Sequence, residues 1–186
     1  MEDYEGYETV RQKLIISGIS EIENHGIADF SLRRVASNCN VSCAAPYKHF
    51  KGKEDFIREI VAYIHSRWML LQNQIEEFFK DDLKKQLTEV CASYVKFWIA
   101  NPNFRSVLTL KTKEFEIESE FSKITDTICT LVKKCCTEFG VSESETEHKC
   151  YVICSLVYGA VLMIDNGDMD GEKTIMMLKK SILKEF

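Results

Sequence analysis

The sequence predicts an all-α protein. Apolar residues recur three or four positions apart in one segment after another, which is the spacing of one face of an α-helix. No segment shows the alternation of apolar and polar residues that is typical of a half-buried strand. The 186 residues include only two prolines and eight glycines, so few positions would interrupt a helix. With 45% hydrophobic and 28% charged residues, the composition is that of an ordinary soluble globular protein.

The first helix is predicted from Tyr7 to Asn24, and His25-Gly26 ends it. Its apolar face carries Val10, Leu14, Ile15, Ile19 and Ile22. This face would pack against the apolar residues of the next segment and brace that segment.

The next helix is short and begins after Ser31, whose side chain is a suitable N-cap. Its apolar stripe has helical spacing and consists of Leu32, Val35, Ala36 and Cys39. Asn40 follows the stripe, and asparagine tolerates the left-handed conformation that ends a helix. We therefore expect a tight turn at Asn40.

A second short helix is predicted after this turn, from Cys43 to about Lys48, with Ser42 as its cap. Pro46 would cost this helix one backbone hydrogen bond, a loss that is tolerated near a helix start. Two short helices joined by a tight turn, braced by a longer one, form a three-helix helix-turn-helix domain.

The charge of this segment is opposite to that of the rest of the chain. Five basic and no acidic residues lie between Ser31 and Lys53, whereas the whole chain has a net charge of −5. The five are Arg33, Arg34, Lys48, Lys51 and Lys53. The remainder therefore carries −10, and a basic patch on an acidic protein is typical of a site for phosphate. The alternative is a solvated helix face.

Three motifs in this region resemble the TetR family of bacterial transcriptional repressors. They are Ser-x-Arg-x-Val-Ala from Ser31, Ala-Pro-Tyr-Lys-His-Phe from Ala45 and Lys-Glu-Asp-Phe from Lys53. The resemblance implies a helix-turn-helix DNA-binding domain over residues 8–68. It also implies a helical domain for effector binding and dimerisation over residues 69–186.

Candidate DNA contacts follow from the residue types and from the matching positions of the family. Tyr47, Lys48, His49 and Lys53 would bind phosphates, and Arg33, together with the Ser31 cap beside it, would bind a phosphate or a base edge. The small residues Cys43, Ala44 and Ala45 would allow close approach to the major groove and contact with a thymine methyl group. For Tyr47 and His49 the alternative is packing inside the domain, because both adjoin the apolar Phe50.

Further helices are predicted along the rest of the chain. They are 53–80, 83–100, 104–110, 116–139, 142–164 and 172–184. The apolar stripe of the long helix from Lys53 runs through Phe56, Ile60, Ile64, Trp68, Leu71, Ile75 and Phe78. Because this helix would belong to both domains, it would couple them mechanically.

The segment from Cys150 to Ile164 is apolar almost all round and contains 15 residues without a charge. This length falls short of the roughly 18 to 20 residues that cross a bilayer, so we expect a buried helix and no membrane. The resemblance implies that the last two long helices pair with those of a second copy in a homodimer. The alternative is the central helix of a monomer.

The C-terminal domain is expected to enclose an apolar pocket for an unknown small-molecule effector. Its candidate lining residues are Trp68, Tyr94, Trp98, Phe104 and Met163. Aromatic residues at helical spacing are equally typical of plain core. An effector that moved the long helix would change the separation of the two DNA-reading domains.

The eight cysteines are expected to be reduced, structural thiols. The acidic N-terminal segment lacks the features of a signal peptide, which favours the cytoplasm. His148, Cys150 and Cys154 would bind a soft metal only with ligands from a partner, so neither metal nor cofactor is expected. No enzyme motif such as GxGxxG, GxSxG or HExxH is present. The alternatives to an effector-released repressor are a cysteine-based redox or metal sensor and, third, a helical enzyme.

Overall fold

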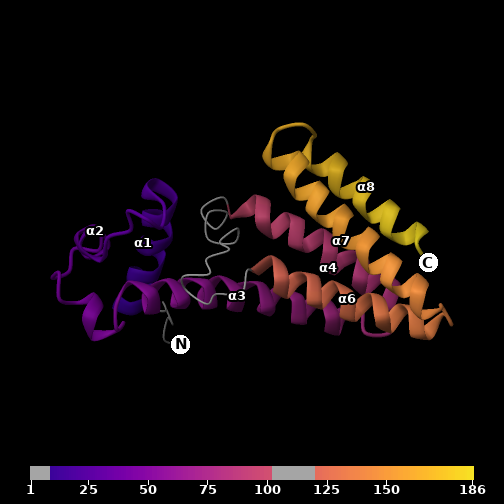
Figure 1. The fold of residues 1–186 in the computed structure, drawn as a ribbon, viewed down its shortest axis with the longest axis horizontal. Helices are drawn as coiled ribbons and strands as arrows, with labels where there is room; N and C mark the ends of the chain where they lie inside the picture. Colours follow the sequence, from indigo (N-terminus) through magenta and orange to yellow (C-terminus); the bar gives the residue numbers. More distant parts are fainter. Residues whose placement is uncertain (1–8, 102–119) are drawn as a thin grey trace, which may run out of the picture. The chain divides into compact units, whose positions relative to one another are not determined.

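The computed structural model describes residues 9–101 and 120–186, with side chains for 9–101 and 125–186 (Figure 1). These residues form helices and no strand, which confirms the all-α prediction. The elements are α1 (Val10–His25), α2 (Leu32–Asn38), the 3₁₀ helix η1 (Pro46–Lys48), α3 (Lys53–Phe78), α4 (Leu83–Ala100), α6 (Glu120–Glu138), α7 (Glu143–Asp165) and α8 (Gly171–Lys184). The predicted helix 104–110 and the first residues of the predicted helix 116–139 lie outside the described residues.

The chain divides into two compact units, and the division falls inside α3 after His65. The described part of unit 1 is residues 9–65, and that of unit 2 is residues 66–101 and 120–186. One continuous helix, α3, therefore supplies residues to both units. The predicted domain division after residue 68 falls in the same helix.

Unit 1 is organised around Phe56, a fully buried residue in the first part of α3. Its ring packs edge-on against Phe50, with centroids 4.3 Å apart, and lies 5.5 Å from the ring of Phe30. On the α1 side, a Cβ added at Gly18 would overlap the Phe56 ring, so only glycine allows this close approach. The predicted face of α1 is buried at Leu14, Ile15, Ile19 and Ile22, whereas Val10 is exposed.

Unit 2 is a bundle in which α4 packs against α6, α7 and α8, and α7 also packs against α6 and α8 (Figure 1). The expected apolar face of α4 is buried throughout at Leu87, Val90, Cys91, Tyr94 and Trp98. By length and composition α7 is apolar enough to cross a membrane, but a core helix passes the same test. Three other helices pack against α7, but 33% of its apolar window is buried, so the expectation of a buried helix is met on one side of α7 only.

The apolar stripe of α3 is not buried along its whole length. Trp68 is 4% exposed, whereas Phe78, at the end of the helix, is 80% exposed and contacts the ring of Phe79. The last turn of α3 is therefore open to solvent. Helical spacing in a sequence does not show where a neighbouring helix stops covering an apolar stripe.

Candidate nucleic-acid interface

The turn after α2 has the geometry expected from its sequence. The side chain of Ser31 accepts a hydrogen bond from the Arg34 N–H, which confirms the predicted N-cap. At the other end, Asn40 has a positive φ of 54°. The N–H groups of Asn40 and Val41 donate to the carbonyls of Ser37 and Ala36, both at 3.0 Å. This is a Schellman motif with asparagine in the left-handed position.

The prediction of an α-helix from Cys43 to Lys48 was wrong in its type. Residues 43–45 form a turn, and Pro46–Lys48 form the 3₁₀ helix η1. Proline has no N–H, so the Ser42 carbonyl cannot accept from position 46 and instead accepts from the Ala45 N–H at 2.9 Å. The proline therefore converts the first turn from α-type to tighter geometry. The three small residues remain at the surface, since Cys43 and Ala44 are exposed and Ala45 is half-buried.

Four of the residues predicted to contact DNA have side chains that face solvent. Tyr47 is 59% exposed, and Arg33, Lys48 and His49 are also exposed. Phe50 is instead buried, so the alternative in which Tyr47 and His49 pack inside the domain finds no support in their exposure. Side chains with charge or hydrogen-bonding groups that face solvent are available for phosphate and base edges.

Lys53 has a structural contact that the sequence did not reveal. Its half-buried side chain donates a hydrogen bond from Nζ to the carbonyl oxygen of Ala28, 3.1 Å away. The contact ties the start of α3 to the loop before α2. An ammonium has three donors, so Lys53 retains others for phosphate.

Arg34, counted above in the basic patch, is held by a buried carboxylate. Its Nε donates to Oε1 of Glu21 at 2.7 Å, and its guanidinium also donates to the carbonyl oxygen of Asp29. Glu21 is 2% exposed, and its Oε1 accepts a further bond from the Ser31 N–H at 3.1 Å. The hydrogen bond to Glu21 raises the pKa of Arg34, which keeps its charge. One carboxylate on α1 thus fixes the first residues of α2.

We expect Glu21→Gln to lower the melting temperature by roughly 5 °C, because it removes the charge that faces Arg34 inside unit 1. The measurement is thermal unfolding followed by circular dichroism. Glu77→Gln is the matched control, since Glu77 pairs with Lys80 at 3.0 Å but is exposed. Equal shifts in the two variants would contradict a special role for the buried carboxylate.

The predicted effector residues lie in two different places within unit 2. Trp68 packs edge-on against Tyr94 with centroids 5.1 Å apart, and Trp98 is also buried. Phe104 lies outside the described residues. Met163 is 45% exposed on α7 and lines a different pocket, between α7 and α8. The structure therefore groups three of the five residues in the core and separates Met163 from them.

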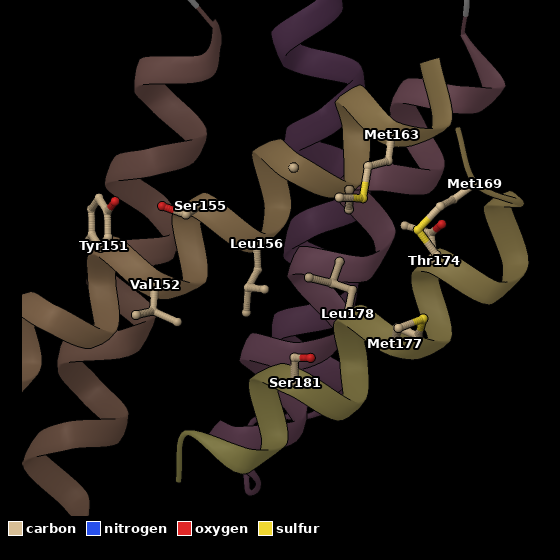
Figure 2. Close-up of a pocket in the computed structure, with 12 residues that line it drawn as sticks. Tyr151, Val152, Ser155, Leu156, Met163, Met169, Thr174, Met177, Leu178 and Ser181 are labelled. Atoms are coloured by element: carbon tan, nitrogen blue, oxygen red, sulfur yellow. The ribbon is translucent and has the colours of Figure 1, made fainter. Parts of the chain in front are cut away.

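The pocket between α7 and α8 has a volume of about 450 Å³ and an apolar lining (Figure 2). Val152, Leu156 and Met163 face it from α7, and Met177 and Leu178 face it from α8. Large apolar side chains are also exposed on both helices. This surface, the α7–α8 face, consists of Tyr151, Leu162, Met163, Met176, Met177 and Leu183. The apolar residues all round α7 had indicated that its surface contacts something on more than one side. No feature of the sequence indicated the pocket.

Cysteines gather in the interior of unit 2 without forming a metal site. Burial raises the pKa of Cys135 to about 11 and those of Cys150 and Cys154 to about 12, so these thiols stay protonated at neutral pH. Within residues 9–101 and 120–186 no group of three histidine, cysteine or carboxylate residues has a metal-binding arrangement.

Comparison with known proteins relates this arrangement to one family. Residues 15–60, which run from α1 into α3, match the sequence profile described as "Bacterial regulatory proteins, tetR family". A curated relative, the "Probable acrEF/envCD operon repressor" of Escherichia coli K12, is 26% identical over 110 residues, or 59% of this chain and 50% of the relative. The chain thus spans about half the length of the curated relatives it matches.

Solved structures show the same fold over nearly the whole chain. A proposed fatty acid metabolism regulator of Clostridium perfringens aligns with a TM-score of 0.76 and 16% identity, covering 94% of this chain and 98% of that one. The regulator FadR of Bacillus subtilis, in complex with stearoyl-CoA, aligns with a TM-score of 0.67 and 15% identity, covering 92% and 95%. Residues 15–60 thus match the N-terminal region of the tetR family of bacterial regulatory proteins, and the chain shares its fold with these solved structures.

Proposed function

We propose that this protein is a transcriptional repressor that binds an operator in double-stranded DNA in the cytoplasm. The observation that carries the proposal is the set of exposed side chains on a TetR-type helix-turn-helix, with Tyr47, Lys48 and His49 on or beside η1 and Arg33 on α2. Phosphate contacts from these residues would fix the register, and the small residues of the 43–45 turn would let the backbone approach the bases. The curated relative is named as an operon repressor, which supports repression over activation.

We propose further that two copies pair through the α7–α8 face. In one copy Tyr151 is 72% exposed and Leu162 is 60% exposed, and large apolar side chains exposed on two neighbouring helices are typical of a protein interface. A symmetric pair uses the same face twice, and its two reading segments would bind a palindromic site. Half-sites should then be separated by about one helical turn of DNA or a small multiple.

Selection from a pool of random DNA duplexes tests the DNA-binding proposal directly. We expect enrichment of one palindromic sequence, bound more weakly as the salt concentration rises. Recovery of sequences without a shared site, with affinity no better than for bulk DNA, would contradict it.

We place the effector in unit 2, where the apolar interior would receive a hydrophobic ligand. Trp68, Tyr94 and Trp98 remain the proposed lining, and the pocket beside Met163 is the second candidate position. The stearoyl-CoA in the Bacillus subtilis FadR structure makes a long-chain acyl-CoA the first ligand to test. Because α3 contributes to both units, a ligand that shifted its second half would change the spacing of the two reading segments.

Stearoyl-CoA is expected to lower operator affinity roughly 150-fold, which corresponds to a coupling of about 3 kcal/mol. By linkage, operator DNA should weaken stearoyl-CoA binding by the same factor. Fluorescence anisotropy of labelled operator measures the operator affinity, and calorimetry measures the affinity for stearoyl-CoA. Coenzyme A without its acyl chain is the control. Binding of stearoyl-CoA that left operator affinity unchanged would exclude this effector mechanism.

A further inference from the structure

Two cysteine sulfurs from different helices meet in unit 2. Cys129 on α6 and Cys154 on α7 have their Sγ atoms 4.0 Å apart. Cys150, one turn before Cys154, directs its thiol to the carbonyl oxygen of Cys129, at 3.9 Å. We propose that Cys129 and Cys154 form an oxidisable dithiol, which a peroxide converts into an intramolecular disulfide joining α6 to α7.

The two members of the pair differ in access to solvent. Cys129 is half-buried, whereas Cys154 is only 8% exposed. Burial also raises the pKa of the Cys154 thiol to about 12, so that thiol does not start the reaction. A peroxide therefore meets Cys129 first, and Cys154 is the resolving thiol.

The chemistry proceeds in two balanced steps. The thiolate sulfur of Cys129 attacks hydrogen peroxide, so that an S–O bond forms, the O–O bond breaks and a sulfenic acid and one hydroxide result. The sulfur of Cys154 then attacks the Cys129 sulfur, the S–S bond forms, the S–O bond breaks and the hydroxyl leaves as water with the Cys154 proton. Two thiols and one peroxide thus give one disulfide and two waters.

Geometry favours Cys154 over Cys150 as the partner. A disulfide has an S–S length of about 2.05 Å, so the two sulfurs in contact must approach by about 2 Å, which side-chain rotation can supply. Cys150 instead directs its hydrogen bond to the backbone of Cys129. The exposed Cys43 and the half-buried Cys39 lie in the other unit and are competing sites of oxidation.

Tryptic peptides identify the bond in the oxidised full-length protein. Residues 124–133 contain Cys129 as their single cysteine, whereas residues 150–173 contain both Cys150 and Cys154. After treatment with one equivalent of hydrogen peroxide and alkylation of the remaining thiols, we expect these two peptides to be linked. The intact monomer should be about 2 Da lighter, and a reductant should restore its mass.

Single variants distinguish the two partners, because both pairings give the same peptides. The link should persist in Cys150→Ser and disappear in Cys154→Ser. The link should also disappear in Cys129→Ser. This variant and Cys150→Ser test the proposal if the variant at the buried Cys154 does not fold. Oxidation confined to Cys43 would overturn the proposal, and so would a link that survives in Cys154→Ser but is lost in Cys150→Ser.

Discussion

Replacing Lys48 and Lys53 together by alanine is expected to lower operator affinity roughly 100-fold and to flatten its salt dependence. In a dimer the double variant removes four phosphate contacts. The slope of log K against log salt should therefore fall by about 3.6, at about 0.9 for each contact. The loss should be similar for specific and unrelated DNA, because phosphate contacts do not read sequence. Anisotropy titrations at several salt concentrations measure both quantities.

A matched control separates local contacts from overall charge. Lys133→Ala and Lys134→Ala together remove the same two charges from exposed positions on α6 and should leave both affinity and slope unchanged. Lys48→Ala alone is the cleaner test, because Lys53 also donates to the Ala28 carbonyl and its loss would affect folding of unit 1. If the Lys48→Ala and Lys53→Ala variants kept the original salt slope, the segment 31–53 would not be the reading surface.

Introducing acidic residues on the α7–α8 face is expected to separate the two copies. Leu162→Glu and Met176→Glu together would bury unpaired charges in the interface and should raise the dimer dissociation constant at least 100-fold. Both side chains are exposed in one copy, at 60% and 64%, so each copy should fold normally. Sedimentation equilibrium measures the dissociation constant, and circular dichroism measures the helical content.

Phe78→Glu is the matched control for this variant. Phe78 is also apolar and exposed, but it lies on α3 outside the α7–α8 face. The control should remain a dimer and bind the operator as before, whereas the double variant should lose most of its operator affinity. A double variant that stayed dimeric would place the interface elsewhere on the protein.

Local signals in the sequence predicted most of the helices. The range predicted for α4, Leu83 to Ala100, agrees with the structure, because Asp82 caps its first turn and Asn101 follows its last. The end of α2 was predicted from Asn40 alone, and its positive φ confirms the reason. Such features depend on contacts within a few residues, so a single sequence contains the information for them.

The predicted helix type was wrong where two local preferences compete. The sequence favoured an α-helix capped by Ser42, but Ala45 precedes η1 and no side chain caps it, because the missing N–H of Pro46 favours a 3₁₀ helix. The sequence also did not reveal that Phe78 is exposed. Phe78 continues the apolar spacing of the buried Trp68, but helical spacing does not show where a neighbouring helix stops covering the stripe.

The sequence by itself determined the all-α fold, the position of the helix-turn-helix and the basic character of its surface, because periodicity, caps and charge are properties of neighbouring residues. Only the tertiary structure decided which of the basic residues are free. Arg33 and Arg34 are adjacent in the chain, yet Arg33 faces solvent and Arg34 is held by Glu21 from another helix. The contact between Cys129 and Cys154 was likewise invisible, since 25 positions separate the two residues and only the packing of α6 on α7 brings them together.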